Sequence, residues 1–224
     1  MSFDFTQKPF DAAEFMDNPE PRCPCLLLLD TSASMSGNPI KQLNDGLTIF
    51  KDELMADAMA IKRVEVGIIT FGPVNIALDF QTADMFTPPM LSTTGNTPMG
   101  QAIESGVELI NSRKAVYRQN GISYYRPWVF LITDGAPTDN WTNAASAVHA
   151  GESSKAFTFF AVGVEGANMD ILARISPPNR KPLHLKELRF RDLFVWLSSS
   201  LGRVSASVPG DTIPLAAPTG WAEV

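Results

Sequence analysis

Cysteine, histidine and long apolar runs are all scarce in this chain of 224 residues. The two cysteines, Cys23 and Cys25, are not accompanied by matching histidines, which argues against a zinc site. Their spacing, two positions apart on one strand, also disfavours a disulfide between them. We therefore expect both to be small core or edge residues.

No apolar run approaches the roughly 20 residues that a membrane span needs. The start of the chain, residues 1–5, lacks the basic and apolar regions of a signal peptide. These two absences predict a cytoplasmic protein without a membrane partner.

Positive charge is also in short supply. The chain has 18 Lys and Arg against 24 Asp and Glu, giving a net charge of −6 and a pI of about 4.9. Because phosphate backbones are bound by basic surfaces, this balance argues against a nucleic-acid partner. The length and a hydrophobic content of 45% predict one globular domain at 22–207, with an N-terminal arm at 1–21 and a Pro-rich tail at 208–224.

Several common catalytic motifs are missing. The sequence has no P-loop pattern, no G-x-G-x-x-G after a strand and no G-x-S-x-G nucleophile elbow. The only histidines, His149 and His184, lie far apart in sequence, and neither stands beside a nucleophile. These absences argue against nucleotide-dependent enzymes of those types and against Ser-His-Asp hydrolases.

Apolar runs alternate along the chain with segments of helical periodicity. Strands are predicted at 25–29, 64–71, 74–80, 128–133, 156–164 and 183–185. Helices are predicted at 39–58, 98–113, 140–154, 169–175 and 190–204, and loops at 81–92 and 114–126. The pattern predicts an α/β fold of the Rossmann type, a doubly wound, mostly parallel sheet with 74–80 as an antiparallel edge strand and helices on both faces. The tail from Val208 is predicted to be extended, either docked or disordered.

Oxygen-bearing side chains stand where predicted strands end. Asp30, Ser32 and Ser34 alternate directly after the buried run 25–29, Thr97 precedes a predicted helix, and Asp134 ends the strand 128–133. Carboxylate and hydroxyl oxygens are the ligands of hard cations such as Mg²⁺, which binds them at about 2.1 Å in octahedral array. Because ligands bind at the carboxyl edge of such sheets, we predict one Mg²⁺ or Mn²⁺ site from these side chains.

Each of these residues also has a purely structural interpretation. Asp30 could form an Asx turn at a strand end, and the two serines could be ordinary turn residues. Thr97, directly before Pro98, could cap the following helix. Asp134 could bond only to the backbone that follows it. Ser36 and Asp139 are nearby oxygens to which no metal role is assigned, although Asp139 or Asn140 is expected to cap the helix 140–154.

The order of these parts resembles a known family. D-x-S-x-S, then a lone loop threonine, then a strand ending in Thr-Asp-Gly is similar to the metal-ion-dependent adhesion site (MIDAS) of the von Willebrand factor type A (VWA) domain. The resemblance covers roughly residues 22–205. The stretches 96–100 and 131–135 look most like bacterial single-domain members, including the TerY-type proteins associated with tellurite resistance and stress response.

The resemblance implies a function for the site. Ser32 and Ser34 would bind the metal directly, Asp30 would orient the site through water, and a Glu or Asp of a partner protein would complete the coordination. The chain would then be a metal-binding protein-protein interaction module without catalytic residues, scaffolding a tellurite-resistance or stress-response complex. A protein kinase or a PP2C-type phosphatase would be candidate partners, because such genes accompany TerY-type genes.

One alternative function uses the same residues. A Mg²⁺-dependent hydrolase, such as a phosphatase, could employ the strand-end carboxylates. That chemistry usually needs an aspartyl nucleophile with a second acid, or two metals. Asp30 is followed by Thr31 and Ser32 instead, and the motif loops offer neither a general base nor a phosphate-binding Lys or Arg. We therefore expect no enzyme activity.

Overall fold

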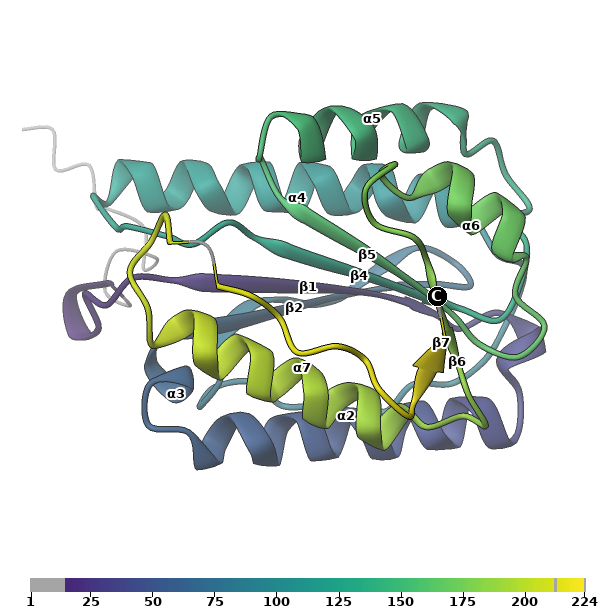
Figure 1. The fold of residues 1–224 in the computed structure, drawn as a ribbon, viewed down its shortest axis with the longest axis horizontal. Helices are drawn as coiled ribbons and strands as arrows, with labels where there is room; N and C mark the ends of the chain where they lie inside the picture. The colour runs from purple at the N-terminus through teal and green to yellow at the C-terminus, as the bar shows by residue number, and fades with distance from the viewer. Residues whose placement is uncertain (1–14, 212, 224) are drawn as a thin grey trace, which may run out of the picture.

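The computed structural model describes residues 15–211 and 213–223, and within them the chain forms one mixed sheet (Figure 1). The strand order is β3-β2-β1-β4-β5-β6-β7. The strands are β1 (Cys23–Asp30), β2 (Val64–Phe71), β3 (Asn75–Thr82), β4 (Trp128–Thr133), β5 (Thr158–Gly163), β6 (Leu183–Leu185) and β7 (Ala222–Glu223). β1, β2, β4, β5 and β6 are parallel, and β3 is an antiparallel edge strand, so the predicted fold class is confirmed.

Helices cover both faces of the sheet. They are α2 (Asn38–Ala56), α3 (Ala60–Arg63), α4 (Met99–Gln119), α5 (Thr142–Ser153), α6 (Met169–Ile175) and α7 (Phe190–Ser205). In Figure 1, α4, α5 and α6 lie on one side and α2, α3 and α7 on the other. Among the described residues, none of these helices combines the length and the apolar character needed to cross a bilayer.

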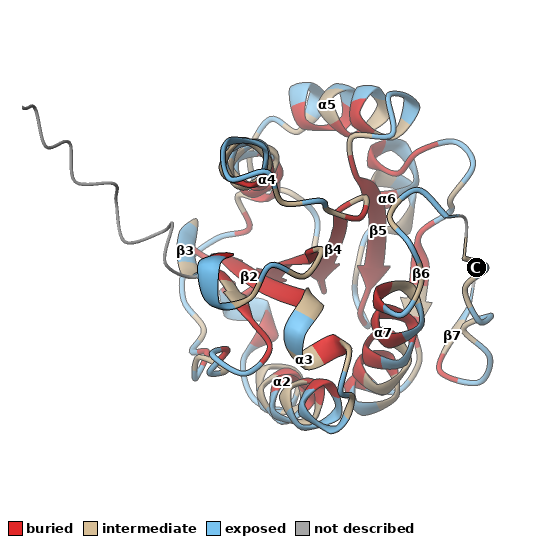
Figure 2. Ribbon diagram, turned by 90° about the vertical axis from the view of Figure 1, so that its left-hand side faces the viewer, coloured by how far each residue is buried: buried red, intermediate tan, exposed pale blue. Residues whose placement is uncertain are grey.

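Strand β1 explains why the sheet needs two layers of helices. All eight of its residues are buried, and successive side chains point to opposite faces. Leu27 and Leu29 join the core under α2 and α7, whereas Leu26 and Leu28 join the core under α4 and α5. Figure 2 shows the result, a buried sheet facing helices whose outer sides are exposed. An uninterrupted apolar run therefore indicates a central parallel strand.

Helix α4 is longer than predicted, because it continues to Gln119 and takes in half of the segment interpreted as a loop. Tyr117 is the reason. It follows Ile103 and Ile110 at intervals of seven residues, so all three side chains are buried on one face of the helix. The sequence analysis assigned 114–126 to a loop and missed this periodicity.

The described part of the C-terminal tail is docked against the domain. Ala222 and Glu223 form β7, which pairs antiparallel with β6, and Trp221 is buried in the core beside Trp196. The Trp196 indole donates to the Ala216 carbonyl at 2.9 Å. Of the two alternatives for this segment, docking holds for 213–223. Residues 1–14 of the predicted N-terminal arm lie outside the described part of the chain.

Both cysteines are expected to be unreactive in the folded protein. Cys23 and Cys25 are fully buried free thiols. Burial raises the pKa of Cys23 to about 12 and that of Cys25 well above its ordinary value, so neither forms the reactive thiolate near neutral pH. A chromogenic disulfide reagent should detect no thiol in the native protein and two after denaturation. Rapid modification of either thiol without denaturant would contradict this burial.

Candidate metal centre

The five predicted ligands lie at the carboxyl ends of β1 and β4, which are neighbours in the sheet. Asp30 ends β1 and Asp134 follows β4, whose register pairs Leu29 with Ile132. Thr97 precedes α4, in the segment that connects this helix with β3. The strand pairing therefore brings segments about 70 and 100 residues apart in sequence to one edge, as expected for parallel sheets.

Close backbone approaches fix the loops around this edge. The Thr94 amide donates to the Thr31 carbonyl at 2.8 Å, and the Ala33 amide donates to the Gly95 carbonyl at 3.1 Å. Gly72 comes so near that a Cβ on it would lie 2.6 Å from the Thr31 carbonyl carbon. Gly95 has a φ of +69°, which favours glycine. The loops that carry Ser32, Ser34 and Thr97 are thus held together by main-chain contacts.

Three of the predicted ligands form a continuous line of oxygens. Ser32 Oγ and Ser34 Oγ are 3.0 Å apart, and the Ser34 hydroxyl donates to Asp134 Oδ1 at 2.7 Å. Ser34 is exposed, whereas Ser32 and Asp134 are buried. The oxygen line therefore reaches from the core to the surface at this edge.

Asp30 lies fully buried at the base of this line. Its Oδ1 accepts from the Ser32 amide at 2.8 Å, which is the Asx-turn geometry considered above, and its Oδ2 accepts from the Thr133 hydroxyl at 2.5 Å. Thr133 Oγ1 in turn accepts from the Gly135 amide at 3.2 Å. The sequence analysis assigned no role to Thr133, although its place before Asp134 was the available signal. Because the Gly135 amide donates to Thr133, it is not the backbone partner considered above for the Asp134 carboxylate.

Thr97 lies beside the same loop but does not cap α4. The Thr97 hydroxyl has no hydrogen-bond partner among the described residues, so it bonds to none of the amides at the start of α4. Thr97 Oγ1 lies 3.6 Å from the position that a Cβ would take on Gly135. The hydroxyl thus faces the loop that carries Asp134.

The amide groups at the start of α4 are capped from a different loop. Asp139 accepts from the Gly100 amide at 3.0 Å and from the Gln101 amide at 2.8 Å. The sequence analysis expected Asp139 or Asn140 to cap α5, and Asn140 does accept from the Thr142 amide there. The bond from Asp139 to α4 spans nearly 40 residues, so it could not be found from local sequence spacing. Thr138 adds a second link, since its amide donates to the Thr97 carbonyl at 2.9 Å.

The two carboxyl groups at this edge are costly to keep ionised together. Burial raises the pKa of Asp30 above its ordinary value, and the nearby charge of Asp134 raises it further, against opposing hydrogen bonds from Ser32 and Thr133. Burial likewise raises the pKa of Asp134. A divalent cation between the two carboxylates would offset the cost of keeping both ionised.

The donor set fits a hard cation. In the part of the chain that the structure describes, no group of three His, Cys, Asp or Glu side chains could hold a metal ion. The oxygen cluster instead combines two carboxylates with the hydroxyls of Ser32 and Ser34, and Thr97 lies next to it. Hydroxyl and carboxylate oxygens suit Mg²⁺ or Mn²⁺ and not a soft metal.

Comparison with protein families gives one match over most of the domain. The family model for the von Willebrand factor type A domain matches residues 26–192, which include all five predicted metal ligands. No curated protein matches the chain in sequence.

Several solved structures share the fold at low sequence identity. The pilus adhesin SpaC from Lactobacillus rhamnosus GG aligns with a TM-score of 0.64 at 14% identity, over 84% of this chain and 31% of SpaC. Proximal thread matrix protein 1 from the mussel byssus aligns with a TM-score of 0.54 at 16% identity, over 82% of this chain and 49% of the mussel protein. The vWF domain of the type V pili tip protein Mfa5 from Porphyromonas gingivalis aligns with a TM-score of 0.53 at 8% identity, over 84% of this chain and 95% of the Mfa5 domain. This chain thus spans less than half of the first two proteins.

Proposed function

Because this chain belongs to the von Willebrand factor type A domain family, we propose that it is a metal-dependent protein-protein interaction module. The domain is commonly used for protein interaction, and here Asp30, Ser32, Ser34, Thr97 and Asp134 would hold Mg²⁺ or Mn²⁺. The observation that carries the proposal is the continuous oxygen line from Ser32 through Ser34 to Asp134. The bound cation would supply an attachment point for a carboxylate of the partner.

The charge count of the cluster supports an acidic partner. Its hydroxyl oxygens are neutral, and only Asp30 and Asp134 contribute negative charge. A partner's Asp or Glu would add a third negative charge and a further hard oxygen, both favourable at a divalent cation. Ser34 is exposed, so the cluster is accessible from solvent.

The sequences of 96–100 and 131–135 look most like those of TerY-type proteins. We therefore propose that the module is a TerY-type protein of the bacterial cytoplasm. There it would scaffold a complex that responds to tellurite or other stress, with a protein kinase or a PP2C-type phosphatase as candidate partner. The pilus adhesins that share the fold show a different use of it, and at 14% identity or less they bear on the fold alone.

We also propose that the module is not an enzyme. Among the described residues, the Asp30 and Asp134 carboxylates accept hydrogen bonds from the Ser32 amide and from the hydroxyls of Thr133 and Ser34. No Lys, Arg or His is paired with either carboxylate there to bind a phosphate or move a proton. Turnover of p-nitrophenyl phosphate in Mg²⁺ would contradict this part of the proposal.

The test is metal-dependent binding of an isolated partner. A protein retained by the immobilised chain in Mg²⁺ would be purified and titrated against wild type and Ser34→Ala, with Ser36→Ala as control because Ser36 bonds to Thr93 outside the oxygen line. We expect EDTA and Ser34→Ala each to weaken binding by at least about tenfold, because EDTA removes the cation that would join the two proteins and Ser34→Ala removes one of the oxygens that would hold it. Ser36→Ala should bind as wild type does. Equal affinity in Mg²⁺ and in EDTA would show that the partner does not use the metal.

A further inference from the structure

A second candidate site lies at the opposite end of the sheet. A cavity of about 550 Å³ opens between the amino ends of β4 and β5 and the segment that follows α7. Its volume is within the usual range for small-molecule sites. The oxygen cluster lies at the carboxyl ends of β1 and β4, so the two sites are at opposite ends of the sheet (Figure 1).

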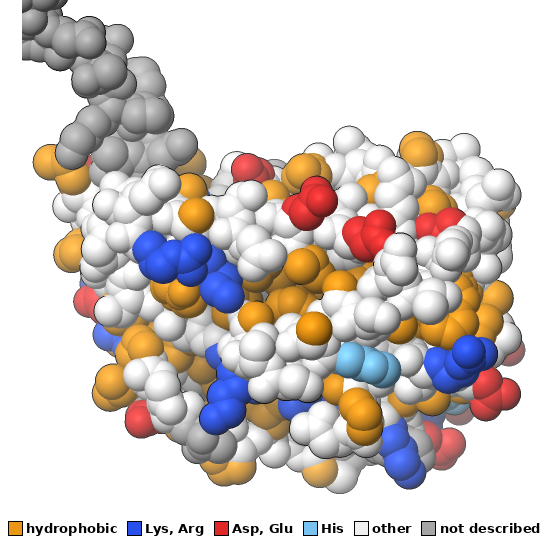
Figure 3. All heavy atoms as spheres, turned by 90° about the horizontal axis from the view of Figure 1, so that it is seen from above, with side chains coloured by type: hydrophobic (Ala, Val, Ile, Leu, Met, Phe, Trp, Pro, Cys, Tyr) orange, Lys and Arg blue, Asp and Glu red, His pale blue; other side chains and the backbone are white. Residues whose placement is uncertain are grey.

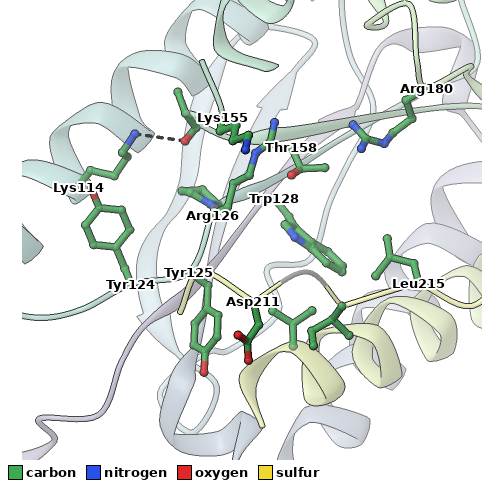
Figure 4. A pocket seen from close by; sticks show the side chains of 15 residues that line it. Lys114, Tyr124, Tyr125, Arg126, Trp128, Lys155, Thr158, Arg180, Asp211 and Leu215 are labelled. Carbon is green, nitrogen blue, oxygen red and sulfur yellow. Dashed lines mark hydrogen bonds between the residues drawn. The ribbon is translucent and has the colours of Figure 1, made fainter. Parts of the chain in front are cut away.

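Basic side chains are concentrated at this cavity. Four of the 18 Lys and Arg residues line it, against Asp211 as the one acidic residue among its described lining. They are Lys114, Arg126, Lys155 and Arg180. Figure 4 shows Lys114, Arg126 and Lys155 along one side and Asp211 on the other. Figure 3 shows Lys and Arg side chains toward both ends of the face that it presents, some of them beside acidic side chains. For a chain of net charge −6, this local excess is unexpected.

The two arginines are partly neutralised and the two lysines are not. Arg126 and Arg180 both form ion pairs with the buried Glu152. Lys114 Nζ donates to the Ala156 carbonyl at 3.2 Å. Within the described residues, the Lys155 side chain has no partner and neither lysine is paired with a carboxylate. With Glu152 and Asp211 counted against the four cations, the site keeps two positive charges.

Lys155 stands at a position where glycine would be favoured. It follows α5 with a φ of +57°, and the Ala156 amide donates back to the Gly151 carbonyl at 2.8 Å, as in a Schellman helix end. A left-handed conformation is unfavourable for a lysine, whereas glycine adopts it readily. A lysine kept there against the local preference is an outlier that points to a use for its charge.

Aromatic and aliphatic side chains provide the rest of the wall. Tyr124 and Trp128 flank the basic residues, and Ile213 and Leu215 approach from the C-terminal segment. We propose that this cavity binds a small phosphate monoester that carries a planar ring, the class to which mononucleotides belong. Its phosphate, with a charge near −2 and three acceptor oxygens, would match the two uncompensated positive charges. Its ring would lie against the aromatic side chains.

Calorimetric titration of AMP and of inorganic phosphate, both in EDTA, tests this inference independently of the metal centre. We expect saturable binding of AMP that weakens with salt. The Lys114→Gln/Lys155→Gly double variant should lose at least about tenfold in affinity, because two charge-assisted contacts are removed. The control is Lys41→Gln/Lys62→Gln, which removes the same charge from exposed lysines outside the cavity and should keep wild-type affinity.

Single Lys155→Gly separates a structural from a binding role. Because glycine accepts the left-handed conformation, the melting temperature of the variant should equal or exceed that of the wild-type protein, while its affinity for AMP falls. Inorganic phosphate should bind more weakly than AMP; equal affinities would overturn the ring's part in the proposal. No saturable binding of either probe at millimolar concentration, or an equal loss in the control variant, would overturn the site as a whole.

Discussion

Replacing Asp30 by alanine is expected to abolish Mg²⁺ and Mn²⁺ binding, with an affinity loss of at least about 100-fold, the upper range for outer-shell partners of a metal. Asp30 is one of only two carboxylates in the oxygen cluster, and it also fixes the turn by accepting from the Ser32 amide. Its loss would remove half of the negative charge and release the turn that presents the two serines. Calorimetric titration of each metal into the chelator-treated protein would measure this effect.

Two further variants make the result specific to charge at this position. Asp30→Asn keeps an acceptor for the Ser32 amide but removes the charge, so it should preserve the turn and still lose the metal. Asp139→Asn alters a neighbouring carboxylate that caps α4 and lies outside the oxygen cluster, so it should bind metal as wild type does. Metal binding that survives in both Asp30 variants would show that the cation binds outside the oxygen cluster.

Much of this architecture follows from local patterns. The run at 25–29 predicted a strand buried on both faces, and β1 is such a strand, because its alternate leucines belong to two separate cores. The spacing of Asp30, Ser32 and Ser34 predicted side chains gathered at one strand end. Strand alternation then predicted that Asp134 would lie nearby, and the Ser34–Asp134 hydrogen bond places it there.

What local patterns could not supply are contacts made across the fold. Thr133 holds Asp30 from the neighbouring strand, and Asp139 caps a helix that begins 40 residues earlier. Neither bond has a sequence spacing that repeats in other proteins, because each depends on which strands become neighbours. The end of α4 was missed for a different reason. The seven-residue spacing of Ile103, Ile110 and Tyr117 was present in the sequence, and only the hydrogen bond from Tyr117 to Glu65 of β2 lay beyond a local window.

Glu65 itself should be among the most damaging positions for stability. It is a fully buried carboxylate on β2 that accepts from Arg22 at 3.0 Å, from Arg113 at 2.7 Å and from the Tyr117 hydroxyl. Arg22 is also fully buried. Glu65→Ala would leave the Arg22 charge in the core without its carboxylate partner, and breaking a buried pair in this way costs about 3–5 kcal/mol. Urea unfolding should show this loss of free energy.

A surface pair of the same chemistry provides the control. Glu20 bonds to Arg63 at 2.7 Å, but its side chain is 38% exposed, so Glu20→Ala should cost no more than about 1 kcal/mol. Glu65→Gln should fall between the two, because it keeps hydrogen-bond acceptance and loses the charge. If Glu65→Ala and Glu20→Ala were equally stable, burial would not govern the strength of these pairs.

The buried Glu65–Tyr117 contact should also determine how stability changes at alkaline pH. Burial, and next the Glu65 charge, raises the pKa of Tyr117 well above its ordinary value, so the folded state keeps the phenol protonated. The unfolded chain loses that proton near pH 10, at the ordinary pKa of about 10. The contribution of Tyr117 to stability is therefore complete below about pH 10 and is lost as the pH rises toward the folded-state value. Glu65→Ala removes one cause of the shift, so its stability should decline less steeply with pH in this range than that of wild type.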